Sequence, residues 1–116
     1  MFPDVLVNLA AAIICFAGTC HPVLVGPETP RGEFQLIHYA TPLKIYKGDF
    51  LAFKETSDAL YTIHRVVNVP GQQRFGRLKS PDVKRRTGIT GGCINVEPEV
   101  YEELVKCCYA SRLIIE

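Results

Sequence analysis

The chain lacks an excess of charge of either sign, a zinc-type spacing of cysteines and any internal repeat. Its 13 Lys and Arg residues nearly balance 12 Asp and Glu residues, which leaves a formal charge of +1. This balance gives no electrostatic basis for binding nucleic acid or an anionic membrane surface. Because there is no Cys-x-x-Cys pair and no Cys/His ligand pattern, we predict no structural metal, and the sequence indicates no cofactor.

A convincing leader is also missing. The apolar segment from Val5 to Gly18 has no Lys or Arg before it and carries Asp4 instead, unlike a signal peptide. It is also too short to cross a bilayer comfortably, so a membrane is not required. We therefore predict that residues 5–25 form core strands. A chain without a leader would be cytoplasmic, exported by a specialised secretion device, or separated from its leader.

The five cysteines give an odd count, so at least one thiol stays free if the others pair. Cys107 and Cys108 are adjacent, and adjacent cysteines rarely bridge each other. The simplest expectation is that these two and Cys15 are small buried apolar residues. The pairing of Cys15, Cys20, Cys107 and Cys108 stays open at this point.

The length and the 47% of apolar residues predict one folded domain over residues 1–116. Short runs rich in β-branched and aromatic residues predict a mainly β chain. The expected strands are 5–9, 21–26, 33–37, 43–46, 50–53, 59–67, 94–96 and 113–115. Residues 10–16 fit either a helix or a hairpin partner, and the polar segment 68–86 is predicted to be a long surface loop. The one clear helix is Pro98–Cys108, with proline near its start and acidic residues in its first turn.

The most informative motif is the glycine-rich stretch 87–96, which holds Cys93. Two glycines, Gly91 and Gly92, let the backbone turn sharply and approach a substrate closely. Their N–H groups and that of Cys93 could then face a developing oxyanion. The alternative is a buried cysteine beside an ordinary turn.

A thiol nucleophile needs a neighbouring base, and His64 in the strongest β run is the best candidate. A backbone carbonyl, such as that of Arg65, would orient its imidazole. Two carboxylates could do so instead: Asp58 and Asp82. The other histidines, His21 and His38, have no partner motif. The bland interpretation of His64 is a hydrogen-bonded structural histidine.

Three stretches occur in an order that resembles the L,D-transpeptidase catalytic domain, the YkuD-like fold. They are Thr29–Phe34, with Thr-Pro-x-Gly-x-Phe, then Ile63–Arg65, with an apolar residue before histidine, and finally Ile89–Val96, with Thr-x-Gly-Cys-x-Asn. The resemblance implies a compact β-sandwich or barrel-like domain with one helix in its C-terminal half. Two features differ from the family pattern. The interval from His64 to Cys93 is longer, with the extra residues in 68–86, and Gly91 stands where a histidine is usual.

The resemblance also implies the site. Cys93 would be the nucleophile, His64 the base, and Gly91 and Gly92 would lie at the oxyanion. The cysteine would attack the diaminopimelate carbonyl of peptidoglycan stem tetrapeptides, release D-Ala, and pass the acyl group to a D-amino acid or a second stem peptide. The site of action would be the periplasm or cell envelope. Arg86 could hold a substrate carboxylate in two bonds. Thr90 and Asn95 could bind substrate, although Thr90 could instead orient the cysteine and Asn95 could cap the helix region.

Two other functions remain open from the sequence. One is hydrolysis on the same scaffold, as an L,D-carboxypeptidase, an endopeptidase or a wall-targeting toxin. The other is a non-catalytic wall-binding domain, which predicts an unreactive, protonated Cys93 at neutral pH.

Overall fold

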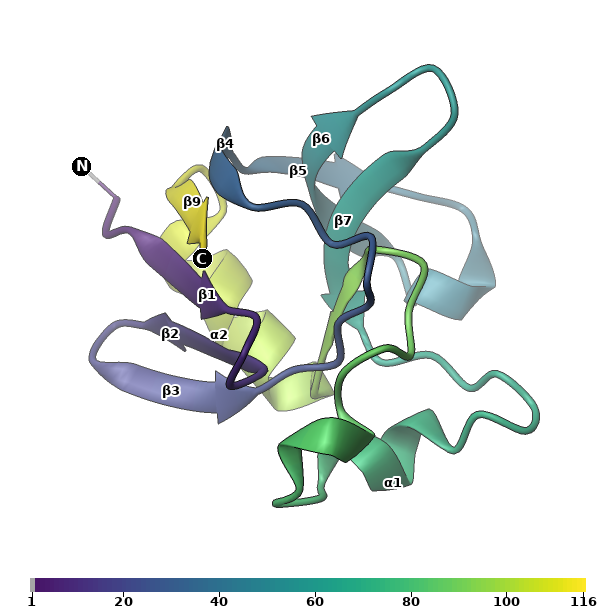
Figure 1. The fold of residues 1–116 in the computed structure, drawn as a ribbon. Coiled ribbons are helices and arrows are strands. Elements are labelled where there is room, and N and C mark those ends of the chain that lie inside the picture. Colours follow the sequence, from purple (N-terminus) through teal and green to yellow (C-terminus); the bar gives the residue numbers. More distant parts are fainter. Residues whose placement is uncertain (1) are drawn as a thin grey trace.

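The computed structural model describes residues 2–116, which form two β-sheets and one main helix (Figure 1). The first sheet has the strand order β3-β2-β1-β9-β4, and the second has the order β5-β6-β7-β8. The mainly β fold predicted from the sequence is confirmed. The strands are β1 Val5–Asn8, β2 Ile13–Phe16, β3 Thr19–Pro22, β4 Gly32–Gln35, β5 Ile37–Ala40, β6 Asp49–Glu55, β7 Leu60–Arg65, β8 Ile94–Val96 and β9 Arg112–Ile115.

The N-terminal apolar segment is part of the core, as the sequence predicted. Alternating residues of β1 and β2 are buried, among them Val5, Val7 and Ile14. β1 pairs antiparallel with β2 and parallel with β9, so the two ends of the described chain lie beside each other in one sheet. The ambiguous segment 10–16 resolves into a turn followed by β2.

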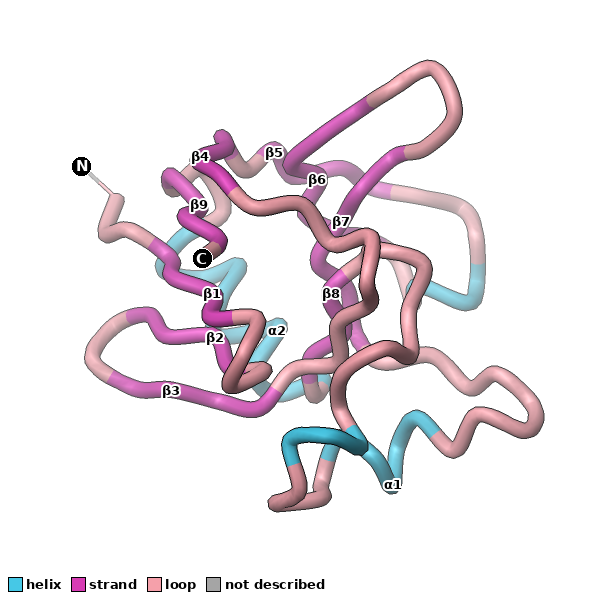
Figure 2. Tube along the Cα trace, viewed as in Figure 1, coloured by secondary structure: helices cyan, strands magenta, loops and turns pink. Residues whose placement is uncertain are grey.

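The long helix α2, Pro98–Cys108, has the bounds that the sequence predicted. Proline stands in its first turn, and Tyr101 and Leu104 on one face are fully buried. These side chains join one apolar cluster with residues of both sheets. In Figure 2, α2 is seen behind β1 and β2, and it contacts β7 of the second sheet. Within residues 2–116, no helix is long and apolar enough to cross a membrane.

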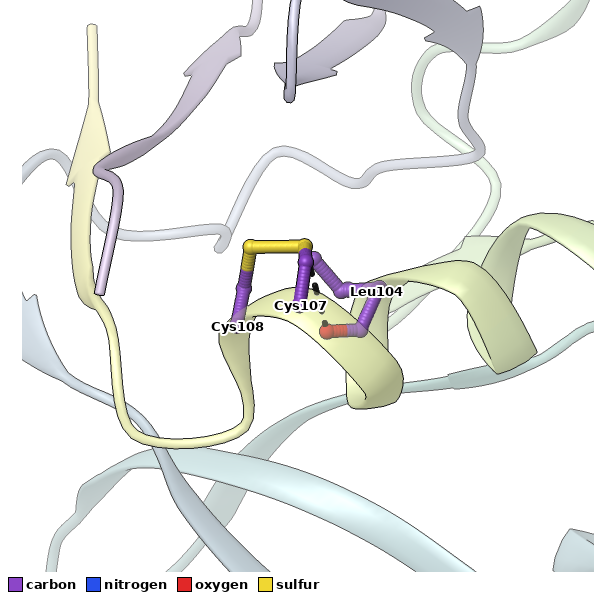
Figure 3. Close-up of a disulfide and its surroundings, with 3 residues drawn as sticks. All are labelled: Leu104, Cys107 and Cys108. Atoms are coloured by element: carbon purple, nitrogen blue, oxygen red, sulfur yellow. Dashed lines mark hydrogen bonds between the residues drawn. A yellow bond between two sulfur atoms is a disulfide. The ribbon is translucent and has the colours of Figure 1, made fainter. Parts of the chain in front are cut away.

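Four of the five cysteines form disulfides. Cys15 and Cys20 face each other across the β2–β3 ladder and are bonded. The adjacent Cys107 and Cys108 at the end of α2 are also bonded to each other, and Cys107 Sγ lies 3.7 Å from the carbonyl oxygen of Leu104 (Figure 3). The expectation that adjacent cysteines stay unpaired was therefore wrong. Cys93 is left as the free thiol of the described chain.

Four segments differ from the local predictions. The predicted strand 21–26 ends at Pro22, because β3 is Thr19–Pro22, and β5 Ile37–Ala40 was not predicted. Residues 43–46 are no strand, because Lys44–Tyr46 forms a 3-10 turn that ends at the left-handed Lys47. The predicted loop 68–86 contains a short helix, α1 Arg74–Leu78, and a 3-10 turn, Val83–Arg85. Leu78 is buried in a small apolar cluster with Leu24 and Val66, so this segment is packed onto the domain rather than a loose surface loop.

Candidate active site

The free cysteine lies on the outer face of the second sheet. Ile37 of β5 pairs with Ala52 of β6, and Ala52 pairs with Thr62 of β7. Cys93, directly before β8, continues this row, because the Thr62 hydroxyl donates to Cys93 Sγ at 3.6 Å. The thiol also lies 3.8 Å from the Leu60 carbonyl oxygen. Cys93 is half-buried, so part of this residue is open to solvent.

His64 stands on the same face, because side chains two residues apart on a strand point the same way. It lies one step beyond Thr62 on that face, about 6.6 Å along β7, and it pairs in register with Asn95 of β8. The sheet thus brings together the two residues that the sequence analysis paired. In unliganded structures the nucleophile and base often stand further apart than in the reacting complex.

The imidazole of His64 is buried, with 3% exposure, and is held in one orientation. Its Nδ1 donates to the Arg65 carbonyl oxygen at 2.7 Å, which is the contact that the sequence analysis suggested. Because a carbonyl only accepts, the neutral ring carries its proton on Nδ1, and the lone pair on Nε2 faces the Asn95 amide at 3.5 Å. Burial lowers the pKa of His64 below 6.5; the bond to Arg65 opposes this shift and the charge of Arg74 adds to it. Burial therefore favours the neutral form of the His64 imidazole.

The side chain of Arg65, the residue whose carbonyl orients His64, is held by ion pairs. The Arg65 guanidinium is paired with Asp49, at 2.6 Å, and with Glu102, and it lies 4.3 Å from the centre of the Tyr101 ring. Asp49 and Glu102 come from β6 and α2, so the residue that orients His64 is anchored to two other elements. We infer that this network limits movement of the imidazole.

The side chain of Asn95 contacts His64 and is closed off from solvent. It is fully buried, and its Nδ2 faces His64 Nε2 at 3.5 Å. Its Oδ1 accepts a hydrogen bond from Arg74 Nη1 at 3.1 Å. Asn95 is therefore not open to substrate in this structure, and neither sequence-based role, substrate binding or helix capping, describes these contacts.

The turn before Cys93 is fixed by Thr90 and Gly92. The buried Thr90 hydroxyl accepts from the Gly92 N–H at 3.2 Å and donates to the Cys93 carbonyl at 2.7 Å. Gly92 has φ +125°, and a Cβ there would lie 2.5 Å from Tyr61 Cε1. The sequence analysis left two roles open for Thr90, orienting the cysteine or binding substrate. The hydroxyl contacts match the first role, because both go to the cysteine turn.

The backbone N–H groups around the cysteine differ in availability. That of Gly92 is already bonded to Thr90, which corrects the expectation that it faces the oxyanion. Those of Gly91 and Cys93 donate to no other group of residues 2–116. A Cβ on Gly91 would meet open space, so this residue borders the accessible side of the turn.

The residues just before the first sequence motif pack directly against the cysteine turn. The Thr29 hydroxyl accepts from the Gly26 N–H at 3.0 Å. The carbonyl of Val25 accepts from the Ile89 N–H, and a Cβ on Gly26 would overlap the Thr90 carbonyl oxygen. The segment that leads into the first motif is therefore fixed against the cysteine turn.

Arg86 is not brought to this place. Its side chain is only 5% exposed, and the guanidinium donates to the carbonyl oxygens of Ala11, Ala12 and Ser80. These bonds tie the segment after β7 to the turn between β1 and β2. The sequence-based role of Arg86 as a holder of a substrate carboxylate is therefore replaced by a structural one.

The remaining sequence candidates also lie elsewhere. The His21 ring is 5.4 Å from that of Phe16 in the first sheet, and His38 is bonded to Asp49 at 2.7 Å. Asp82 caps the 3-10 turn at Val83–Arg85. Within residues 2–116, no group of three or more His, Cys, Asp and Glu residues could hold a metal ion.

Sequence reasoning missed Arg74, which lies in the segment predicted to be a surface loop. Besides its bond to Asn95, its Nε donates to Gln72 Oε1 at 2.7 Å. Its charge adds to the lowering of the pKa of His64. The residues around Arg74 do not distinguish it from the neighbouring arginines. The extra length of the segment between His64 and Cys93 is the one sequence feature that could have indicated an additional site residue there.

Comparison with known proteins supports the fold. The chain matches no protein-family model and no curated protein. Solved structures do match it over almost its whole length. L,D-transpeptidase 3 from Mycobacterium tuberculosis has a TM-score of 0.63 at 13% identity, with 98% of this chain and 60% of that chain covered. An L,D-transpeptidase from Xylanimonas cellulosilytica has a TM-score of 0.62 at 13% identity, with 99% and 60% covered.

A third match, an L,D-transpeptidase from Mycobacterium smegmatis, has a TM-score of 0.60 at 17% identity, with 98% of this chain and 58% of that chain covered. The chain thus spans 60% or less of the length of these proteins. At such identities the likeness concerns the fold. The chain has the fold of the L,D-transpeptidases, the YkuD-like domain that its three motifs predicted.

Proposed function

We propose that this protein is a cysteine acyltransferase of the L,D-transpeptidase type that acts on peptidoglycan stem peptides in the cell envelope. The observation that carries the proposal is the pairing of a free, half-buried Cys93 with His64 on one sheet face. The Nδ1–Arg65 bond puts the lone pair of His64 on Nε2, where only the long contact to the Asn95 amide, at 3.5 Å, competes for it, and this nitrogen can accept a proton. The fold match to L,D-transpeptidases supports the same chemistry.

In the first half-reaction, His64 Nε2 takes the proton of the Cys93 thiol after the side chain turns from Thr62 toward the imidazole. The thiolate attacks the diaminopimelate carbonyl, and a C–S bond forms. The N–H groups of Gly91 and Cys93 stabilise the oxyanion. When the tetrahedral intermediate collapses, the C–N bond breaks and the imidazolium gives its proton to the amine of D-Ala.

In the second half-reaction, the amine of a D-amino acid or of a second stem peptide attacks the thioester. His64 takes a proton from this amine, a new C–N bond forms, and the C–S bond breaks. The imidazolium then returns its proton to the thiolate. Water in place of the amine gives a trimmed tripeptide, so one acyl-enzyme accounts for both transfer and hydrolysis.

The donor peptide has a surface of mixed apolar and polar side chains available beside the thiol, the polar ones being Gln35, Lys54 and Glu55. A cavity of about 120 Å³ lies on this side of the sheet, and Ile37, Tyr39, Ala52 and Leu60 are among its lining residues. Ile37 and Tyr39 on β5 are 49% and 47% exposed. Large exposed apolar side chains next to a reactive group are typical of a binding surface.

Product analysis tests the proposal. The protein is incubated with a disaccharide-tetrapeptide and excess D-Met, beside Cys93→Ala, and the muropeptides are separated by chromatography and mass spectrometry. A D-Met-exchanged muropeptide with the wild type alone is the expected result. A tripeptide alone would identify a hydrolase, and an unchanged muropeptide would contradict the proposal.

A further inference from the structure

Arg74 enters the candidate site from a segment outside the three motifs. It is the first residue of α1, in the stretch that lengthens the interval between His64 and Cys93. Two side chains fix its guanidinium: Gln72 accepts from Nε at 2.7 Å, and Asn95 accepts from Nη1 at 3.1 Å. Its position is therefore coupled to Asn95, which touches the imidazole of His64.

Part of the guanidinium is unused. Arg74 Nη2 donates to no group of residues 2–116, and the side chain is only half-buried. No carboxylate of the described chain pairs with Arg74, whereas Arg65 pairs with Asp49 and Glu102. Arg86 is occupied by three carbonyl oxygens. Arg74 is thus a positioned cation beside the site with donor capacity left for an anion.

Its charge reaches the reacting groups. It contributes to the lowered pKa of His64, after burial, and a Cys93 thiolate opposes the loss of charge on Arg74. These effects agree with the chain of contacts from Arg74 through Asn95 to His64. Geometry gives the same placement, because Arg74 bonds to Asn95, two residues after Cys93, and an anionic part of a substrate bound at Cys93 can approach this guanidinium.

We propose that Arg74 binds the free α-carboxylate of the amino acid on the far side of the bond that Cys93 cleaves. This inference rests on the proposed function. In that reaction the scissile carbonyl is followed by an amide nitrogen, one α-carbon and then the terminal carboxylate of D-Ala. A planar guanidinium with a free N–H edge suits a carboxylate. The residue that leaves would thus have to be C-terminal.

The experiment compares two donors, one ending in D-Ala and one ending in D-Ala amide, in the rate at which Cys93 is acylated. The full chain is used as wild type, Arg74→Gln, Arg74→Lys and Arg85→Gln. Arg85 is an exposed arginine of the same segment whose side chain has no contact in this site, so it controls for charge. Circular dichroism melting shows whether each variant is folded.

We expect the wild type and Arg85→Gln to prefer the free carboxylate. With the free-carboxylate donor, Arg74→Gln should lower the rate of Cys93 acylation roughly 10- to 100-fold, as expected for the loss of one charged hydrogen bond. With the amide donor, the acylation rate of this variant should equal that of the wild type. Arg74→Lys should keep part of the preference. Equal losses with both donors would mean that Arg74 only supports Asn95, and would overturn the inference while the proposed function stands. A wild type that is acylated by neither donor would overturn both.

Discussion

Gly92 is the residue of the cysteine turn that tolerates substitution least. Its φ of +125° is one that a side chain rarely adopts, and strain of this kind costs about 1–3 kcal/mol. A Cβ there would also lie 2.5 Å from Tyr61 Cε1 and 3.3 Å from the Glu28 carbonyl oxygen. Overpacking of this kind costs typically about 1–3 kcal/mol. We therefore expect Gly92→Ala to lower the free energy of unfolding by about 2–6 kcal/mol.

The matched control for this change is Gly91→Ala, where the added Cβ meets open space and φ is not in the left-handed region. Its stability should stay within about 0.5 kcal/mol of the wild type. Urea unfolding, followed by circular dichroism, gives both values. If Tyr61 simply turns aside, the cost for Gly92→Ala falls toward the strain alone. Equal stabilities of the two variants would refute the steric reasoning.

Three further predictions concern the base, the turn and the segment that carries Arg74. The pKa of His64 lies below 6.5 because burial disfavours its charged form, so the fold loses stability as the pH falls below 6.5. NMR titration of the imidazole in Cys93→Ala should give this lowered pKa. Adding Arg74→Gln should raise the pKa, because a positive charge is removed. A ring that titrates above 6.5 would contradict the account. Thr90→Val removes two hydrogen bonds of a buried hydroxyl and should cost about 1–3 kcal/mol in urea unfolding and slow alkylation of Cys93; an unchanged alkylation rate would show that the turn does not need this clamp. Leu78→Ala should cost about 2–5 kcal/mol, because Leu78 is buried, whereas a loose loop would lose almost nothing.

Local sequence signals predicted the elements whose pattern is self-contained. Proline, an acidic first turn and an apolar face gave α2 its correct bounds, and the β-branched runs gave β7 and β8. The segment 43–46 has strand-like residues, yet it forms a 3-10 turn. Its exposed Ile45 finds no neighbouring strand, and tertiary pairing decides such short runs.

The candidate site was predicted in part. Cys93 and His64 carry recognisable motifs, and their strands are neighbours in the sheet. The roles of the arginines depend on contacts between distant residues. Arg86 and Arg74 have the same chemistry in the sequence, but one is occupied by carbonyl oxygens and the other reaches Asn95. No periodicity in segment 68–86 distinguishes them.

The central claim is that Cys93 forms a covalent acyl-enzyme, and intact-protein mass spectrometry tests it most directly. The wild type and Cys93→Ala are mixed briefly with a disaccharide-tetrapeptide and quenched in acid. We expect the wild type, and not Cys93→Ala, to gain the mass of the muropeptide minus D-Ala. Peptide mapping should assign this added mass to Cys93. No adduct on the wild type, or the same adduct on Cys93→Ala, would contradict the account.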